Sequence, residues 1–376
     1  MFPDDKEIQL LCDGTEAFPE ILSCIRNAEK SIFINMFIWR NDEIGKAIAQ
    51  ELITAANRGV SITIQKDRYG ISLEYCEEDQ TSLFHPVPTA YEAATIKTLE
   101  LLYNPDLLGK EHTGIIEPLA AQLLSHPNVT VNCETVRKDH SKFYIFDDEI
   151  LIFGGINIED KENGSDRQGR AYRDFMVKIT GRNWVDSFYN YRKGIETPAL
   201  FKGNQKQPVT FFHVKDVYLD LINQAKKELT ILMAYFSPMP EFVTVLERAM
   251  DRGVHIRILI PAKANFDDDT NKRTLSILYT YAKENRRQLA LFLSPDMTHT
   301  KFLMSESIIS LGSCNITRNA FDTLDEMNVV YPNGNTEFAK RANAHADEII
   351  ASAKRVTSLK DLSYSRVRAL MERTVM

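Results

Sequence analysis

The chain has 376 residues, of which 44% are hydrophobic and 26% charged, and its formal net charge at pH 7 is −7. This length and apolar content indicate an ordinary globular protein of about two domains, each able to bury a core. The negative charge argues against a protein that binds duplex DNA, because affinity for the phosphate backbone depends on clustered lysine and arginine.

The first residues, Met1–Glu7, are acidic where a signal peptide would be basic, and no apolar run reaches the roughly eighteen residues of a membrane helix. Five cysteines are scattered and form no Cys-x-x-Cys pattern, so the sequence indicates neither a disulfide framework nor a zinc site. We therefore expect a cytoplasmic protein that meets a membrane only at its surface.

Apolar periodicity predicts alternating helices and strands in the first half of the chain. A helical pattern around Phe18–Ala28 is followed by a strand at Ser31–Trp39, a helix at Ile44–Arg58 and a strand at Val60–Lys66. Gly59 ends the second helix at the position after its C-cap, where glycine is favoured.

An insertion near Tyr69–Ser125 follows these elements. Gly59 and His140 lie 81 positions apart, whereas the equivalent Gly253 and His299 lie 46 apart, so the first half carries about 35 additional residues. Apolar and aromatic residues between polar stretches predict helices that pack over the site as a lid or a lipid-facing cover. An extra structural layer without contact to a substrate is the alternative.

The first motif follows the insertion: His140-x-Lys142, then Asp147, then Gly155 and Asn157. On an extended strand, residues i and i+2 point to the same face, so the motif presents an imidazole and an ammonium group together. Strand-like runs before and after a polar turn at Asp147 predict a hairpin that leads into the glycines.

The second half repeats the order of elements. A helix at Val217–Lys227, a strand at Leu229–Tyr235, a helix at Phe242–Arg252 and a strand at Val254–Ile260 correspond to those of the first half. This internal duplication predicts an α/β sheet in each half.

The second motif reads His299-x-Lys301, then Glu306, then Ser313 and Asn315. A third His-x-Lys, at His213, lacks the downstream glycine and asparagine, so we attribute it to chance.

Two copies of this pattern supply what one phosphodiester needs. A histidine can act as nucleophile and a second one as acid, because the pKa of imidazole lies near neutrality. Small residues at Gly155 and Ser313 would let the backbone approach a phosphate, and Asn157 and Asn315 would add amide donors.

These motifs resemble the paired HKD motifs of the phospholipase D superfamily, H-x-K-x4-D followed by two small residues, a variable residue and Asn. Within it, the chain is most similar to bacterial cardiolipin synthases. Further similarity lies in Ile8–Leu11, Ile38-Trp39, Tyr172–Asp174 and Ala234–Pro238, and the resemblance extends over about 7–330.

The resemblance implies two duplicated phospholipase D-like α/β sandwich domains with pseudo-twofold symmetry and the active site between them. We expect one domain at 1–200, with the insertion near 69–125, and the other at 207–356. The tail, 357–376, is expected to be helical. Its mixture of leucines and arginines suits either an anionic membrane surface or, more commonly, docking against the protein body.

The resemblance also implies roles for the motif residues. His140 is the expected nucleophile and His299 the general acid, while Lys142 and Lys301, with the two asparagines, neutralise charge on the phosphoryl oxygens. Since these groups do the work that metal ions do elsewhere, we expect no metal and no cofactor.

Acids complete the predicted catalytic set. In the family an orienting acid follows each histidine and reaches across to the opposite half, which pairs Asp174 with His299 and Glu326 with His140. The motif acids are Asp147 and Glu306. Glu306 departs from the family's Asp, and the second motif is one residue shorter to its first small residue; in the family this acid is structural.

The function that the resemblance implies is a phosphatidyltransferase of the cardiolipin synthase type. It would act on phosphatidylglycerol at the inner face of a bacterial membrane, through a phosphohistidine. A phospholipase D that transfers the phosphatidyl group to water is the second hypothesis. A nuclease is disfavoured by the acidic charge, and a binding scaffold without activity by the complete motifs.

Overall fold

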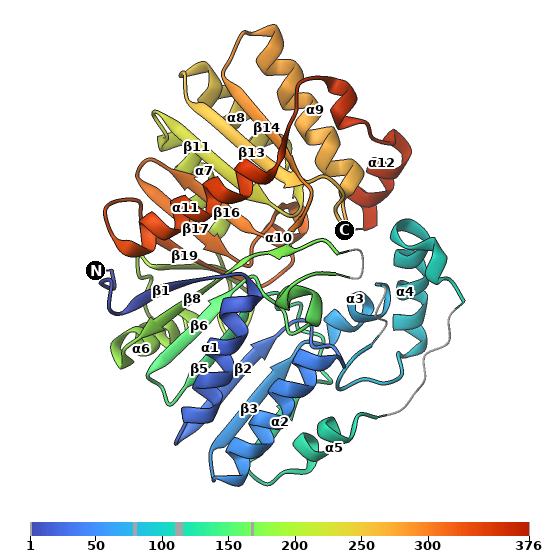
Figure 1. Cartoon of the computed structure of the whole chain (residues 1–376), viewed down its shortest axis with the longest axis vertical. Helices are drawn as coiled ribbons and strands as arrows, with labels where there is room; N and C mark the ends of the chain where they lie inside the picture. The colour runs from blue at the N-terminus through green and yellow to red at the C-terminus, as the bar shows by residue number, and fades with distance from the viewer. Residues whose placement is uncertain (1, 78–80, 110–115, 167–168, 376) are drawn as a thin grey trace.

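The structure is a computed structural model that describes residues 2–77, 81–109, 116–166 and 169–375. Its first and second halves lie one above the other along the longest axis of the molecule, blue to green below and yellow to red above in Figure 1. Each half is built on one large mixed sheet with helices beside it. This is the duplicated α/β fold that the sequence predicts, so that prediction is confirmed.

In the first half, the sheet order is β1-β8-β6-β5-β2-β3-β4. Strand β2 runs parallel to β3 and antiparallel to β5. The elements are β1 (Ile8–Cys12), α1 (Asp13–Asn27), β2 (Ser31–Met36), α2 (Glu43–Asn57), β3 (Ser61–Lys66), β4 (Val129–Asn132), β5 (Lys142–Phe146), β6 (Ile150–Gly154), η3 (Asp160–Asn163), β7 (Tyr172–Arg173), β8 (Phe175–Thr180) and α6 (Arg182–Arg192).

In the second half, the sheet order is β10-β9-β19-β17-β16-β11-β13-β14-β20. The elements are β9 (Phe201–Gln205), β10 (Phe211–Phe212), α7 (Val214–Gln224), β11 (Glu228–Met233), β12 (Phe236–Ser237), α8 (Pro240–Asp251), β13 (His255–Pro261), α9 (Asp268–Glu284), β14 (Leu289–Ser294), β15 (Met297–Thr298), β16 (Lys301–Ser305), β17 (Ile308–Gly312), β18 (Ile316–Thr317), α10 (Arg318–Asp322), β19 (Glu326–Pro332), α11 (Glu337–Ser352) and β20 (Lys354–Arg355).

The two sheets share one topology. The order β8-β6-β5-β2-β3-β4 of the first sheet is repeated as β19-β17-β16-β11-β13-β14 in the second. The duplication extends to the edge, because β1 and β9 each pair antiparallel with the outer strand of that run. Strand β9 lies between the limits expected for the two domains and pairs within the second sheet.

The boundaries of the predicted elements differ from the structure by a few residues. Helix α1 starts at Asp13 rather than near Phe18, and β2 ends at Met36 rather than at Trp39. Trp39 leaves the strand because its main chain bridges Ile158, just after the first motif.

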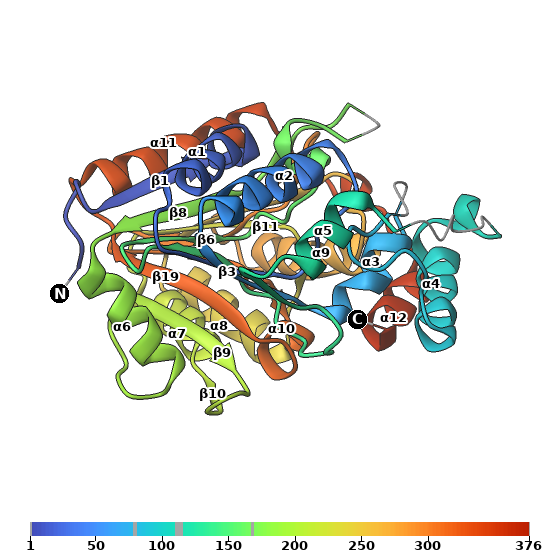
Figure 2. The same ribbon diagram turned by 90° about the horizontal axis from the view of Figure 1, so that it is seen from below.

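The two halves meet through a shared apolar core. One face of each sheet contributes to it, and the rings of Phe175 and Phe302 lie 5.5 Å apart between their centroids. The helices α6 and α11 pack into the same core, and Figure 2 shows α11 beside α1, across the boundary between the halves. Burial of this large apolar surface holds the halves together and so defines the site between them.

The insertion contains η1 (Arg68–Gly70), α3 (Ile71–Tyr75), α4 (Ala90–Tyr103), η2 (Pro105–Leu107) and α5 (Pro118–Ser125). Helix α5 packs against α2 and β4, whereas α3 and α4 lie at one side of the boundary between the halves.

The tail forms η4 (Leu359–Leu362) and α12 (Arg366–Val375) and docks against α9. The fully buried Glu372 carboxylate accepts the N–H of Thr270 at 2.8 Å and its hydroxyl at 2.7 Å. The described part of the tail therefore docks against the protein body, which is the second of the two arrangements expected from the sequence. Throughout the described ranges, no helix combines the length and apolar character needed to cross a membrane.

Candidate active site

His140 lies beside an acid of the second half. The residue before it, Asp139, forms a parallel bridge with Asp325, and the His140 N–H donates to the Asp325 carbonyl oxygen at 2.8 Å. The residues that follow this bridge, His140 and Glu326, therefore lie side by side. Nδ1 of His140 is 3.0 Å from Oε1 and 3.1 Å from Oε2 of Glu326. Because Nδ1 is engaged, Nε2 is the nitrogen left for a substrate.

His299 lies beside two acids of the first half. Strands β15 and β7 pair in parallel with Thr298 opposite Arg173, so the next position sets His299 beside Asp174. Nδ1 of His299 lies 3.0 Å from Oδ2 of Asp174 and 3.1 Å from Oε1 of Glu162. The expected pair is in contact, but sequence reasoning missed Glu162, whose one signal is the acidic run just after the first motif.

The two histidines have opposite pKa shifts. Burial lowers the pKa of His140 well below its usual value, and the two motif lysines add to this shift. Burial and Lys301 would also lower the pKa of His299, but Glu162 and Asp174 outweigh them and raise it. His140 is therefore unprotonated near neutral pH, whereas His299 keeps its proton to a higher pH than an ordinary imidazole does.

The motif lysines lie beneath the histidines. Nζ of Lys142 donates to the carbonyl oxygen of His140 at 2.5 Å, and Nζ of Lys301 to that of His299. Burial lowers the pKa of Lys142 to about 7, with a further contribution from Lys301, and burial raises the pKa of the Glu326 carboxyl to about 8. An anion at this place would be favoured, because it would stabilise both ammonium groups.

Asn157 and Asn315 line the cavity onto which the histidines open. The side-chain amide of Asn157 donates to Glu159 at 3.4 Å, while Oδ1 of Asn315 accepts the N–H of Tyr235 at 3.4 Å. Both asparagine side chains are thus held at the cavity wall. This is the place from which they could contact a bound phosphate.

Gly155 and Ser313 each lie beside an acid that orients a histidine, and their predicted contact with a phosphate stays a prediction. A Cβ at Gly155 would lie 2.2 Å from Oδ2 of Asp174, so glycine leaves room for that acid. The Ser313 hydroxyl donates to Glu326 and accepts the N–H of Met327 at 3.0 Å. These equivalent positions therefore hold the acids behind the histidines.

The motif acids bind main-chain N–H groups, and their place in the predicted catalytic set stays a prediction. Asp147 accepts the three successive N–H groups of residues 29–31 at 2.7–2.9 Å. Glu306 accepts the N–H of Lys226 at 2.8 Å and that of Glu228 at 3.4 Å. Both hold the turn from a helix into the central strand, which is the structural role that the resemblance implies for Glu306.

The departure at Glu306 has a geometric reason. Residues 147–149 join β5 to β6, but only 306–307 join β16 to β17. The additional methylene of glutamate extends the carboxylate from the shorter turn to the same main-chain groups.

The histidines share a cavity of about 130 Å³ between the halves, and the insertion forms one of its walls. Helix α3 contributes Ser72 and Leu73, and α4 contributes Thr95 and Leu99. The insertion therefore packs over the site, as expected of a cover. It is not a structural layer remote from the site.

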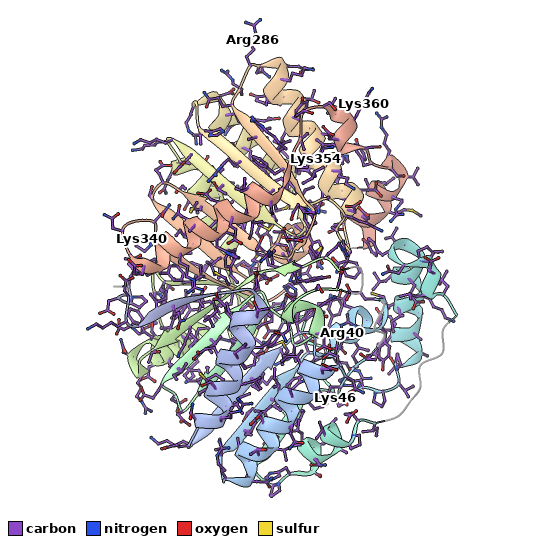
Figure 3. All side chains as sticks on the ribbon, in the orientation of Figure 1. Arg40, Lys46, Arg286, Lys340, Lys354 and Lys360 are labelled. Carbon is purple, nitrogen blue, oxygen red and sulfur yellow. The ribbon has the colours of Figure 1, made fainter. Side chains whose placement is uncertain are left out.

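A buried cluster of four charges forms another wall. Arg40 lies inside the body in Figure 3 and pairs with Glu159 at 2.6 Å and with Glu77. Lys161 pairs with the same two carboxylates at 3.2 and 2.5 Å. Glu77 also accepts from Asn265 of the second half at 2.5 Å, which ties the insertion across the boundary. The charges balance, so this wall carries no net charge.

Among the described residues of the site, Glu162, Asp174 and His299 have ligand atoms close enough together to hold a cation. Nζ of Lys301 already supplies a positive charge there, 3.3 Å from Oδ2 of Asp174.

The chain was compared with known proteins. Residues 21–191 and 218–350 match the family model described as "Cardiolipin synthase, PLD-like domain". "Cardiolipin synthase B" of Salmonella typhi is 25% identical over 342 residues, which cover 83% of this chain and 73% of that protein. The enzyme of the same name from Escherichia coli strain K12 is 24% identical over 355 residues, covering 87% and 76%.

Among solved structures, phosphatidylserine synthase of Haemophilus influenzae Rd KW20 is similar, with a TM-score of 0.66 at 15% sequence identity. The match covers 98% of this chain and 92% of that one. At this identity, the likeness supports the fold.

Proposed function

The chain belongs to the family of phospholipase D-like domains of cardiolipin synthase and is a phosphatidyltransferase of the phospholipase D superfamily, and we propose that it joins two phosphatidylglycerol molecules into cardiolipin and releases glycerol. The observation that carries this proposal is the pair of buried histidines on a single cavity, with the pKa of His140 lowered and that of His299 raised.

The proposed reaction has two steps. Nε2 of His140 attacks phosphorus, the bond from phosphorus to the glycerol oxygen breaks, and His299 gives its proton to the departing glycerol. A hydroxyl of the second phosphatidylglycerol then attacks the phosphohistidine, gives its proton to His299 and frees His140. Lys142 and Lys301 would stabilise the charge on the phosphoryl oxygens in both steps.

Two features of the site support an alcohol rather than water as acceptor. The cavity is small and walled by the insertion, which limits the water available to a phosphohistidine. A second, more polar cavity of about 370 Å³ shares Glu77, Lys161, Tyr172 and Asn265 with the first, and this lining of charged and amide groups suits a glycerol headgroup.

The acyl chains would remain in the membrane while the headgroup enters the cavity, so we expect the enzyme to act at a membrane surface as a peripheral protein.

The test is product analysis by mass spectrometry after the protein is incubated with phosphatidylglycerol liposomes. We expect cardiolipin and glycerol, and neither product from the His140→Asn variant. Phosphatidic acid without cardiolipin would instead identify a phospholipase D. The absence of both lipid products from folded protein would contradict the proposal.

A further inference from the structure

A second group of side chains with metal-ligating chemistry lies at the base of the insertion, outside the described cavity lining. It consists of His85, in the segment before α4, and Cys133 and Glu134, just after β4. One ligand atom of each lies within 4.8 Å of the others. His85 and Cys133 are each 4% exposed.

The imidazole of His85 is the unusual member of the group. It is almost fully buried, yet neither ring nitrogen has a hydrogen-bond partner among the described residues. Its main chain is held in place, because the Tyr75 hydroxyl donates to the His85 carbonyl oxygen at 2.6 Å. A buried polar group without a partner is costly, and a ligand to the ring would remove that cost.

The separations of the Glu134 oxygen from the other two ligand atoms fit a tetrahedral zinc ion. Nε2 of His85 lies 3.5 Å from Oε1 of Glu134, and Sγ of Cys133 lies 3.6 Å from the same oxygen. Usual zinc bond lengths give separations of about 3.4 Å between nitrogen and oxygen ligands and about 3.6 Å between sulfur and oxygen ligands in a tetrahedron.

The surroundings of Glu134 orient its carboxylate for this role. Arg68 holds the other oxygen, Oε2, and leaves Oε1 toward the histidine and the thiol. Arg68 is itself fixed by Glu92 at 2.8 Å, and Glu92 closes the capping box with Thr89 at the start of α4. Such second-layer contacts are typical of metal ligands.

Charge and access are also compatible with a divalent ion. A Cys133 thiolate and the Glu134 carboxylate would balance its two charges, and the nearby Lys66 is already paired with Glu74 at 2.9 Å. Glu134 is 71% exposed on its side chain, so solvent can reach the group and supply a fourth ligand.

We propose that His85, Cys133 and Glu134 bind a zinc ion that ties the insertion to the end of β4. Imidazole, thiolate and carboxylate together suit Zn²⁺ better than Mg²⁺ or Ca²⁺. Binding displaces the thiol proton of Cys133 to solvent. The ion would stabilise the segment that leads into α4, whose Thr95 and Leu99 line the active-site cavity.

The test uses the full chain, first stripped with a chelator and then titrated with zinc against a chromophoric competitor. We expect one tightly bound zinc per chain and a rise in the midpoint of thermal unfolding. Cobalt should give a thiolate-to-metal charge-transfer band. Cys133→Ser should abolish this band, and His85→Gln should lower zinc affinity by about tenfold or more.

Cys24→Ser removes another buried thiol, in α1, and should bind zinc as the unaltered chain does. Glu134→Gln changes an exposed side chain and should fold normally but bind more weakly, so the test does not depend on the buried variants. The absence of a cobalt–thiolate band in the unaltered protein, or unchanged zinc affinity in folded Glu134→Gln and His85→Gln, would overturn the proposal.

Discussion

His140 and His299 occupy equivalent places in two sheets of the same topology, yet their surroundings differ. His140 faces the single carboxyl group of Glu326, whereas His299 faces Asp174 and Glu162. The position five residues after the motif asparagine is Glu162 in the first half and Ala320 in the second. The additional acid beside His299, together with the two motif lysines that act on His140, therefore separates the pKa values of the two imidazoles.

This difference shows how a duplicated fold can assign two roles to one motif. The nucleophile must be unprotonated and the general acid protonated before the reaction starts. The pKa of His140 is lowered and that of His299 raised, so each shift favours the protonation that the proposed role of that histidine needs.

Replacement of His140 by asparagine should lower activity by about 10⁴-fold or more, because the nucleophile itself is lost. No phosphohistidine should form with any substrate. Intact-protein mass spectrometry after quenching without acid measures the adduct. An adduct on His299 in this variant would show that the two roles are reversed.

The His299→Asn variant should lose about 10²–10⁴-fold in rate on phosphatidylglycerol, because the departing glycerol no longer receives a proton. A nitrophenyl phosphodiester has a leaving group that needs little protonation. With it, the variant should accumulate a phosphohistidine at position 140. Equal losses on both substrates would contradict a role for His299 as acid.

Glu162→Gln should move the basic limb of the pH profile of kcat/KM to lower pH. The raised pKa of His299 keeps its proton as pH rises, and activity is lost above that pKa; removal of the Glu162 charge lowers it. The acid limb should stay where it is, since it follows the lowered pKa of His140.

Glu29→Gln, an exposed change, is the control for the pH experiment. A loss of activity in Glu162→Gln that is equal at every pH would indicate that Glu162 acts only on structure.

The motif acids should act on stability rather than on chemistry. Asp147→Ala and Glu306→Ala should each lower the free energy of unfolding by about 1–2 kcal/mol, because several main-chain N–H groups lose a charged acceptor. Glu306→Asp should keep turnover nearly unchanged. Denaturant unfolding and initial rates measure the two effects, and a large rate loss in a folded Asp variant would place Glu306 in the chemistry.

Chelation should have the smallest effect on the rate. Lysine and amide groups are expected to stabilise the phosphoryl charge, so the initial rate with EDTA should remain within about twofold at a temperature where the protein stays folded. The proposed zinc ion lies outside the described cavity lining, so its removal should change the unfolding midpoint instead. Complete loss of activity that magnesium restores would contradict this mechanism.

Much of the site could be predicted from sequence because its signals are local or repeated. The same-face geometry of His140 and Lys142 follows from two residues on one strand, and the second copy supports the first. The pairing of Asp174 with His299 and of Glu326 with His140 came from the resemblance to the family. The structure adds the physical reason, which is the register of the two parallel pairings between the halves.

Other contacts could not be predicted from sequence, because residue type alone does not show which way a group faces. Gly155 and Ser313 have the small side chains that a phosphate cradle would use, but they serve the acids behind the histidines. Glu162 was missed because its contact is with His299 of the other half, although it follows the first motif closely in sequence.

The duplication, the α/β elements and the residue types that phosphoryl transfer requires could be predicted from the amino-acid sequence, because periodicity and motif spacing are properties of short segments. The folded structure was needed to show which histidine faces two acids, where the insertion packs and how close His85 lies to Cys133. These features depend on burial and on contacts between distant segments. Since burial and nearby charge set a pKa, the difference between the two histidines arises only when the halves pack together.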